Sequence, residues 1–219
     1  MTGIDTDAKR LGLFGGLGQA LDFRSAPGFV GIRLGERPSV QLDERAACSG
    51  GGLDLFRIGI DEKADLDARL AKRLGAPRIR VALKQESDIE FARRAADEAA
   101  EQDVQLVHQC HTLSLFETVE SIEKTLRAID RPNFGLVYEP ANLEICRQDY
   151  GRETINRLAK WIFNVYLQNQ ALKPDGAVTL PTWCVGDVSF DLISVHDLGG
   201  VDYDRVFDGL KSIGYNGTV

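Results

Sequence analysis

Apolar stretches with two different periods alternate along the chain. Short runs rich in Val, Ile, Leu and aromatic residues indicate strands, and longer stretches with an apolar residue every three or four positions indicate helices. The expected strands are residues 53–60, 78–83, 104–107, 134–138, 162–167 and 188–195, with a candidate early strand at 29–34. The expected helices are residues 65–74, 88–101, 115–129, 152–160 and 203–213.

This alternation predicts an α/β fold, with a parallel sheet and helices on its faces. Two closures are consistent with the pattern: an open doubly wound sheet, or a barrel of eight units. No GxGxxG motif follows a strand, so the dinucleotide-binding form of the open sheet lacks its phosphate fingerprint. We expect a single domain over residues 1–219, in which residues 1–52 carry the weakest pattern.

Composition narrows the classes of partner. The chain has 219 residues and a formal net charge of -7, which argues against a general nucleic-acid binder. No apolar run approaches the roughly 20 residues that span a bilayer, and the first ten residues, with Asp5 and Asp7, do not resemble a signal peptide. The four cysteines are widely spaced, as expected of reduced thiols in a cytoplasmic protein.

The first candidate site lies at the end of the strand at 104–107. Two of the three histidines in the chain, His108 and His111, fall here. Because side chains alternate along a strand, Gln109 and His111 share one face, and His108 and Cys110 share the other. The functional interpretation is a metal or proton-transfer site; the alternative is one buried, hydrogen-bonded histidine and one exposed histidine.

Three further strand ends carry polar residues. Glu139, followed by Asn142, ends the strand at 134–138; it is a candidate base, metal ligand or partner for a sugar hydroxyl, or else a structural ion pair. Tyr166 and Gln168 offer uncharged donors and acceptors that suit a polyhydroxylated ligand, although a polar turn explains them equally. His196, in a loop before two glycines, is a candidate ligand-facing histidine.

Several stretches together resemble a known family. They are LGAPRIRV (74–81), VQLVHQCHT (104–112), TVESIEKTLRAIDRPNFGLVYEPANL (118–143), WIFNVYLQNQ (161–170) and GGVDYDRVFDGLKSIGYNGTV (199–219). The order resembles the sugar phosphate isomerase/epimerase family of xylose-isomerase-like TIM barrels, from about residue 53 to the end. The resemblance implies a (β/α)8 TIM barrel, truncated at its last strand or closed in an unusual way.

The resemblance also implies one divalent metal, Mn, Mg or Zn. The family's ligands are a Glu ending the fourth strand, an Asp ending the fifth, a His ending the sixth and a Glu ending the eighth. Here Gln109, Glu139 and Tyr166 stand at the first three places, and Asn142 stands where a second His often follows. A hard ion is held weakly by such a set unless a histidine joins it, so the expected metal ligands are Glu139 and His111.

Two functions follow. The first is an isomerase or epimerase, or a related lyase, that moves a proton next to a carbonyl of a sugar or cyclitol, with Glu139 and His111 as the catalytic groups. The second is a non-catalytic barrel that binds a sugar-like ligand after losing the metal ligands. The expected substrate-binding residues are Gln109, Asn142, Tyr166, Gln168 and His196. DNA repair is a disfavoured third function, and we expect no membrane partner. The sequence is compatible with a homo-oligomer.

Overall fold

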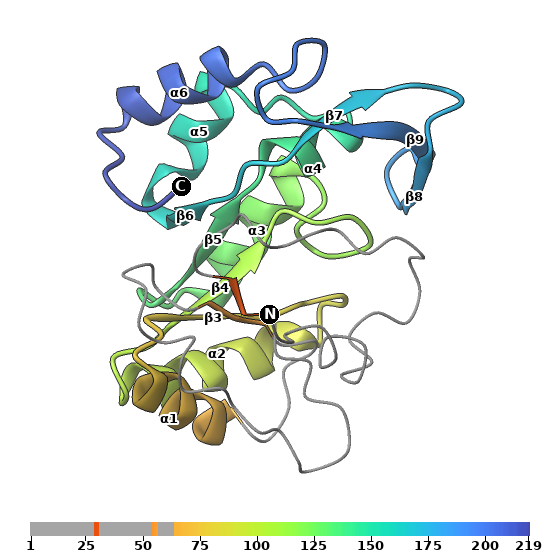
Figure 1. Ribbon diagram of the computed structural model, residues 1–219. Helices are drawn as coiled ribbons and strands as arrows, with labels where there is room; N and C mark the ends of the chain where they lie inside the picture. Colours follow the sequence, from red (N-terminus) through yellow and green to blue (C-terminus); the bar gives the residue numbers. More distant parts are fainter. Residues whose placement is uncertain (1–28, 31–53, 57–63) are drawn as a thin grey trace, which may run out of the picture.

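A parallel sheet with helices along it forms the body of the molecule (Figure 1). The computed structural model describes residues 29–30, 54–56 and 64–219. The sheet strands are β1 (Phe29–Val30), β2 (Asp54–Phe56), β3 (Arg78–Arg80), β4 (Gln105–Gln109), β5 (Phe134–Tyr138) and β6 (Ile162–Val165). The helices are α1 (Ala64–Leu74), α2 (Asp88–Ala100), α3 (Val119–Ile129), α4 (Pro140–Ile145), α5 (Arg152–Leu158) and α6 (Tyr203–Ser212), with a 3₁₀ turn, η3 (Ala159–Trp161).

All six strands run parallel and pair in chain order, β1 to β6. The predicted strand–helix alternation is therefore confirmed, and so is the parallel sheet. Residues 31–34 and 57–60, which were expected to extend the first two strands, lie outside the described residues. The other four strands of the sheet are within a few residues of their predicted positions, and β5 coincides with its prediction.

The sheet is buried on both faces at its centre. All five residues of β5 are buried, as expected of a parallel strand covered on both sides. Leu106 and Leu136 belong to the main apolar cluster, together with the buried alanines of α2. Their neighbours Val107 and Val137 are also buried but face the other side. The sheet thus has a helix-covered face and an inner face.

Helix α3 begins four residues after its predicted start. The apolar residues Leu115 and Phe116 continue the helical pattern, but they lie in the loop before the helix. Thr118 has an extended backbone and its side chain accepts a hydrogen bond from the Ser121 amide, so it caps the helix. The cap is therefore a residue inside the predicted helix.

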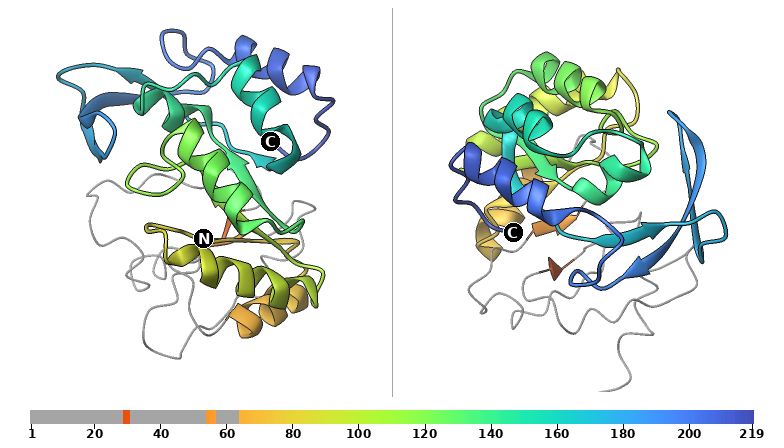
Figure 2. Two further views of the ribbon diagram at one scale, coloured as in Figure 1. Left: turned by 180° about the vertical axis from the view of Figure 1, so that it is seen from behind. Right: turned by 90° about the horizontal axis from the view of Figure 1, so that it is seen from above.

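A separate antiparallel sheet follows β6. Its strands are β7 (Asn169–Leu172), β8 (Val178–Thr182) and β9 (Gly186–Ile193), in the order β7-β9-β8. The predicted strand at 188–195 exists as β9, but it pairs with β7 and β8 instead of the parallel sheet. Figure 2 shows this sheet projecting to one side of the body. A small apolar cluster of Ile145, Val188 and Phe190 attaches it to α4.

The end of the chain returns to the parallel sheet. The Val165 amide donates to the Thr218 carbonyl at 3.2 Å, so the segment expected to begin the last barrel strand lies beside β6. Among the described helices, none combines the length and apolar character needed to span a bilayer.

Candidate functional site

Strand register places four polar side chains on the inner face of the sheet. Arg80 pairs with Val107, and Gln109, two residues further along β4, pairs with Val137. Glu139 lies two residues beyond Val137, so alternation keeps all these side chains on one face. Tyr138 pairs with Val165, which aligns Glu139 with Tyr166, the residue just after β6. The ends of β3 to β6 therefore present Arg80, Gln109, Glu139 and Tyr166 along one edge.

Direct hydrogen bonds join three of these side chains. Arg80 Nη1 donates to Gln109 Oε1, and Gln109 Nε2 donates to Glu139 Oε2. Pro140 starts α4 directly after Glu139, which brings Asn142 back over the strand end, where its Nδ2 also donates to Glu139 Oε2. Among the described residues, no hydrogen bond reaches the other carboxylate oxygen, Oε1. The structure thus brings together Gln109, Glu139 and Asn142, three of the residues that the sequence analysis singled out.

Glu139 is buried and electrostatically unusual. Its side chain is 1% exposed. Burial raises the pKa of Glu139 to about 7, while hydrogen bonds from Gln109 and Asn142, and then the positive charge of Arg80, act in the opposite direction. A carboxyl group with a pKa near neutrality can both accept and release a proton at neutral pH.

Two phenols lie within electrostatic reach of Glu139. Burial raises the pKa of Tyr166 and of Tyr203, and the Glu139 charge raises both further. Both phenols are therefore protonated at neutral pH and act as hydrogen-bond donors. The Tyr203 hydroxyl donates to the Gln168 carbonyl at 2.6 Å, which ties α6 to the segment between β6 and β7.

Gln168, a predicted substrate-binding residue, directs its side-chain amide to Gln170. Gln168 Nε2 donates to Gln170 Oε1 at 3.4 Å. Gln170 is fully buried and donates to the Ala141 carbonyl at 2.6 Å. Gln168 is thus connected through Gln170 to the first turn of α4, rather than to Glu139 itself.

The three histidines have three different environments. His108 is buried on the helix-covered face, its ring stacked on Phe116 at a centroid distance of 3.9 Å. Burial lowers the pKa of His108 to about 3, so it is a neutral core residue. His196 is exposed in the loop after β9, and no described contact connects it to Glu139.

His111 lies just beyond β4, partly open to solvent. Its Nδ1 lies 2.9 Å from the Thr112 carbonyl. Loss of solvent around the imidazole ring lowers the pKa of His111, and the charges of Arg80 and Lys84 lower it further. The charge of Arg80 lowers the pKa values of both His111 and Glu139. His111 therefore lies near Arg80, as Glu139 does, but no described contact joins His111 to Glu139.

The donor set does not fit the divalent metal that the family resemblance implies. The oxygen of Gln109 accepts from Arg80, and its amide nitrogen faces Glu139, so neither atom is offered to a cation. Tyr166 is a protonated phenol, which binds such metals poorly. The Arg80 guanidinium already supplies positive charge beside Glu139. One carboxylate alone is a weak site for a hard ion.

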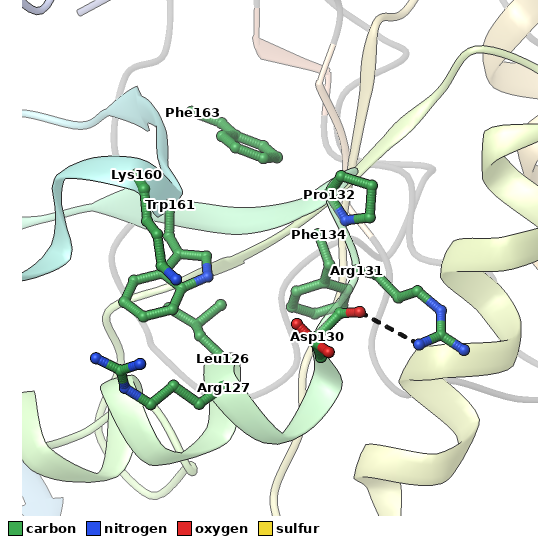
Figure 3. A pocket seen from close by; sticks show the side chains of 9 residues that line it. All are labelled: Leu126, Arg127, Asp130, Arg131, Pro132, Phe134, Lys160, Trp161 and Phe163. Carbon is green, nitrogen blue, oxygen red and sulfur yellow. Dashed lines mark hydrogen bonds between the residues drawn. The ribbon is translucent and has the colours of Figure 1, made fainter.

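A pocket of about 390 Å³ lies away from these residues. It is lined by the end of α3, by Trp161 of η3, and by Phe134 and Phe163 near the starts of β5 and β6 (Figure 3). These are the amino-terminal ends of the strands, whereas Glu139 follows a carboxyl-terminal end. In barrels of this type the chemistry is at the carboxyl-terminal ends, so we assign the pocket no catalytic role.

Arg80 and Tyr203 were not predicted from the sequence as residues of the site. The apolar run 78–83 continues past Arg80, so this strand seemed to end at Leu83, although β3 ends at Arg80. A rule that considered every inward-facing polar residue in that run would have found it. Tyr203 lies on a helix, and nothing local in the sequence signals its approach to the strand ends.

Comparisons with known proteins agree with this architecture. A Xylose isomerase domain protein from Planctomyces limnophilus has a TM-score of 0.64 at 13% identity, over 88% of this chain and 80% of that one. The probable 3-DHS dehydratase AsbF from Bacillus anthracis has a TM-score of 0.61 at 16% identity, over 88% and 69%. An L-ribulose 3-epimerase has a TM-score of 0.61 at 16% identity, over 87% and 69%.

Identities this low establish the fold alone. A search of curated protein sequences found no significant match. The family model described as xylose isomerase-like TIM barrel matches residues 62–219, well over half of the chain. The chain therefore belongs to the xylose isomerase-like TIM barrel family.

Proposed function

We propose that the protein is an isomerase or epimerase that moves a proton on the carbon next to a carbonyl of a small polyhydroxylated substrate, a sugar or a cyclitol. The observation that carries this proposal is Glu139, a buried carboxyl with a pKa raised to about 7 at the carboxyl-terminal edge of the sheet. A base poised near neutral pH is the central requirement of such a reaction.

The proton transfer follows from the residues around Glu139. The ionised carboxylate takes the proton from the substrate carbon, and the electron pair of the broken C–H bond moves toward the carbonyl oxygen, giving an enediolate. The cation of Arg80 and the protonated phenol of Tyr166 are the groups that can stabilise the oxygen's negative charge, since the Tyr203 hydroxyl donates to the Gln168 carbonyl. Return of the proton to the same carbon, or to its neighbour, gives an epimer or an isomer.

His111 is proposed as a second acid–base group. It is partly exposed at the edge of the site and lies near Arg80, where it could exchange a proton between a substrate hydroxyl and solvent. Its lowered pKa keeps the ring neutral at pH 7. Replacement by Asn would then slow substrate turnover more than it weakens substrate binding.

Relatives of similar fold support the substrate class. The solved structures of similar fold include an L-ribulose 3-epimerase and a probable 3-DHS dehydratase. Gln109, Asn142 and Gln168 offer amides at the same edge, and amides both donate to and accept from hydroxyl groups.

Solvent exchange tests the proposal. The full-length protein is incubated in deuterated water with a panel of ketoses and inososes, in the presence of a chelator, and loss of C–H signals is followed by NMR. We expect exchange with at least one substrate class, lost in Glu139→Gln and retained in Glu123→Gln, a surface carboxylate on α3 paired with Arg127 and Arg157. Exchange that Glu139→Gln leaves unchanged would refute the proposal.

A second candidate function is a sugar-binding barrel without catalysis. Gln109 and Tyr166 stand where the family resemblance implies metal ligands, and this departure favours the binder. Saturable binding of a ketose or inosose by calorimetry, weakened by Gln109→Ala and Tyr166→Phe, with no C–H exchange for any compound, would establish it in place of the enzyme.

A further inference from the structure

A second cluster of chemically reactive side chains lies outside the Glu139 site. It consists of Glu117 from the loop between β4 and α3, Cys146 at the end of α4, and Cys184 in the turn between β8 and β9. Their ligand atoms, one from each residue, all lie within 4.8 Å of one another. Three elements that are distant in sequence therefore bring two thiols and a carboxylate to one point.

The separations match a tetrahedral zinc site. Zinc binds sulfur at about 2.3 Å and carboxylate oxygen at about 2.0–2.2 Å, which places tetrahedral oxygen and sulfur ligands about 3.5–3.7 Å apart. Glu117 Oε1 lies 3.8 Å from Cys146 Sγ and 3.5 Å from Cys184 Sγ. These two oxygen–sulfur separations fit a zinc ion, and the two sulfurs lie within 4.8 Å of each other.

The carboxylate in this cluster is buried, and no cation of the described residues is paired with it. Glu117 is 3% exposed. Among the described residues it accepts hydrogen bonds from the two thiols and from the Trp183 amide, at 2.7 Å, and forms no ion pair. Burying a carboxylate in this way is costly unless a positive charge compensates it. The Trp183 amide is the kind of outer hydrogen bond that orients a metal-binding carboxylate.

We propose that Glu117, Cys146 and Cys184 bind a zinc ion, which fastens the β8–β9 turn to α4 and to the loop before α3. Cys184 is exposed, so water can occupy the fourth position. Binding displaces one proton from each thiol, and it weakens at low pH because the thiolate is the metal-binding form. This site is independent of Glu139 and does not rest on the proposed enzymatic function.

Cobalt titration of the reduced, full-length protein tests the site. Cobalt replaces zinc in tetrahedral sites and gives a thiolate-to-metal charge-transfer band in the near ultraviolet, together with visible bands of tetrahedral intensity. We expect these bands to saturate at one cobalt for each chain and to disappear when zinc is added. Trp183, 57% exposed and next to Cys184, gives a second readout through quenching of its fluorescence.

Variants assign the bands to the cluster. Cys184→Ser changes an exposed residue, so the variant should fold, and it should lose the charge-transfer band. Glu117→Gln should weaken binding, whereas Cys110→Ala, at a buried cysteine outside the cluster, and Glu139→Gln should keep the full signal. Circular dichroism confirms that each variant is folded.

Three results would overturn the proposal. One is the absence of a thiolate band at saturating cobalt, and another is a band that Cys184→Ser leaves unchanged. The third is a Cys146–Cys184 disulfide, found by mass spectrometry in protein kept under reducing agent, because it would show that the two sulfurs meet to bond each other.

Discussion

Glu139 should lower the stability of the folded protein at neutral and alkaline pH. Its ordinary pKa of 4.5 rises to about 7 in the folded state, chiefly because the side chain is buried. The folded protein therefore holds this proton more tightly than the unfolded chain does. The stabilisation from the protonated carboxyl is fully present below pH 4.5, and it is lost as the pH rises through about 7.

The size of the effect follows from the two pKa values. They differ by about 2.5, and each tenfold change in proton affinity corresponds to about 1.4 kcal/mol. Glu139 should thus cost about 3 kcal/mol of unfolding free energy at pH 8 relative to pH 4. Glu139→Gln keeps an acceptor oxygen for Gln109 and Asn142 but cannot ionise, so the variant should exceed the parent by about this amount at pH 8 and match it near pH 4.

Urea unfolding monitored by circular dichroism, at several pH values between 4 and 8, measures this difference. Glu123→Gln is the control, because hydrogen bonds from Arg127 and Arg157 lower the pKa of Glu123, so removing its charge should not stabilise the protein at pH 8. A stability difference between Glu139→Gln and the parent that stays constant over the whole pH range would refute the argument.

Three further predictions concern other positions. Gln109→Glu places a second carboxylate beside Glu139, so it should create manganese binding, measurable by electron paramagnetic resonance, that the parent lacks. His108→Phe should reduce the acid sensitivity of the fold. The pKa of His108 falls from 6.5 to about 3 on burial, so the parent should lose stability as the pH decreases through this range, and acid titration by circular dichroism compares the two. Thr118→Ala removes the cap on the Ser121 amide and should cost about 1 kcal/mol of unfolding free energy in urea.

The local sequence pattern predicted the strands of the parallel sheet, but it did not predict the start of α3 or the separate antiparallel sheet. The run FGLVY predicts β5 because a fully apolar stretch bounded by turns has few other stable uses in an α/β fold. The start of α3 was wrong because Phe116 fits the helical period, yet its ring instead stacks on His108. Periodicity also cannot choose a strand's partner, so β9 was not recognised as part of a separate antiparallel sheet.

The site was predictable to the extent that it depends on strand ends. Gln109, Glu139 and Tyr166 could be found because parallel strands end at the same edge. Asn142 was singled out because it follows Glu139 and stands where the family resemblance implies a second His. Packing between elements that are distant in sequence brings Tyr203 near Glu139 and Cys146 near Cys184. No short sequence motif predicts such contacts.

The pH dependence of substrate C–H exchange, measured with a chelator present, tests the central claim most directly. If Glu139 is the base, the exchange rate should rise as the pH increases through about 7, where its carboxyl ionises, and Glu139→Gln should abolish exchange at every pH. A rate that depends on added metal, or that the variant retains with the same pH profile, would show that the proton is moved by other groups.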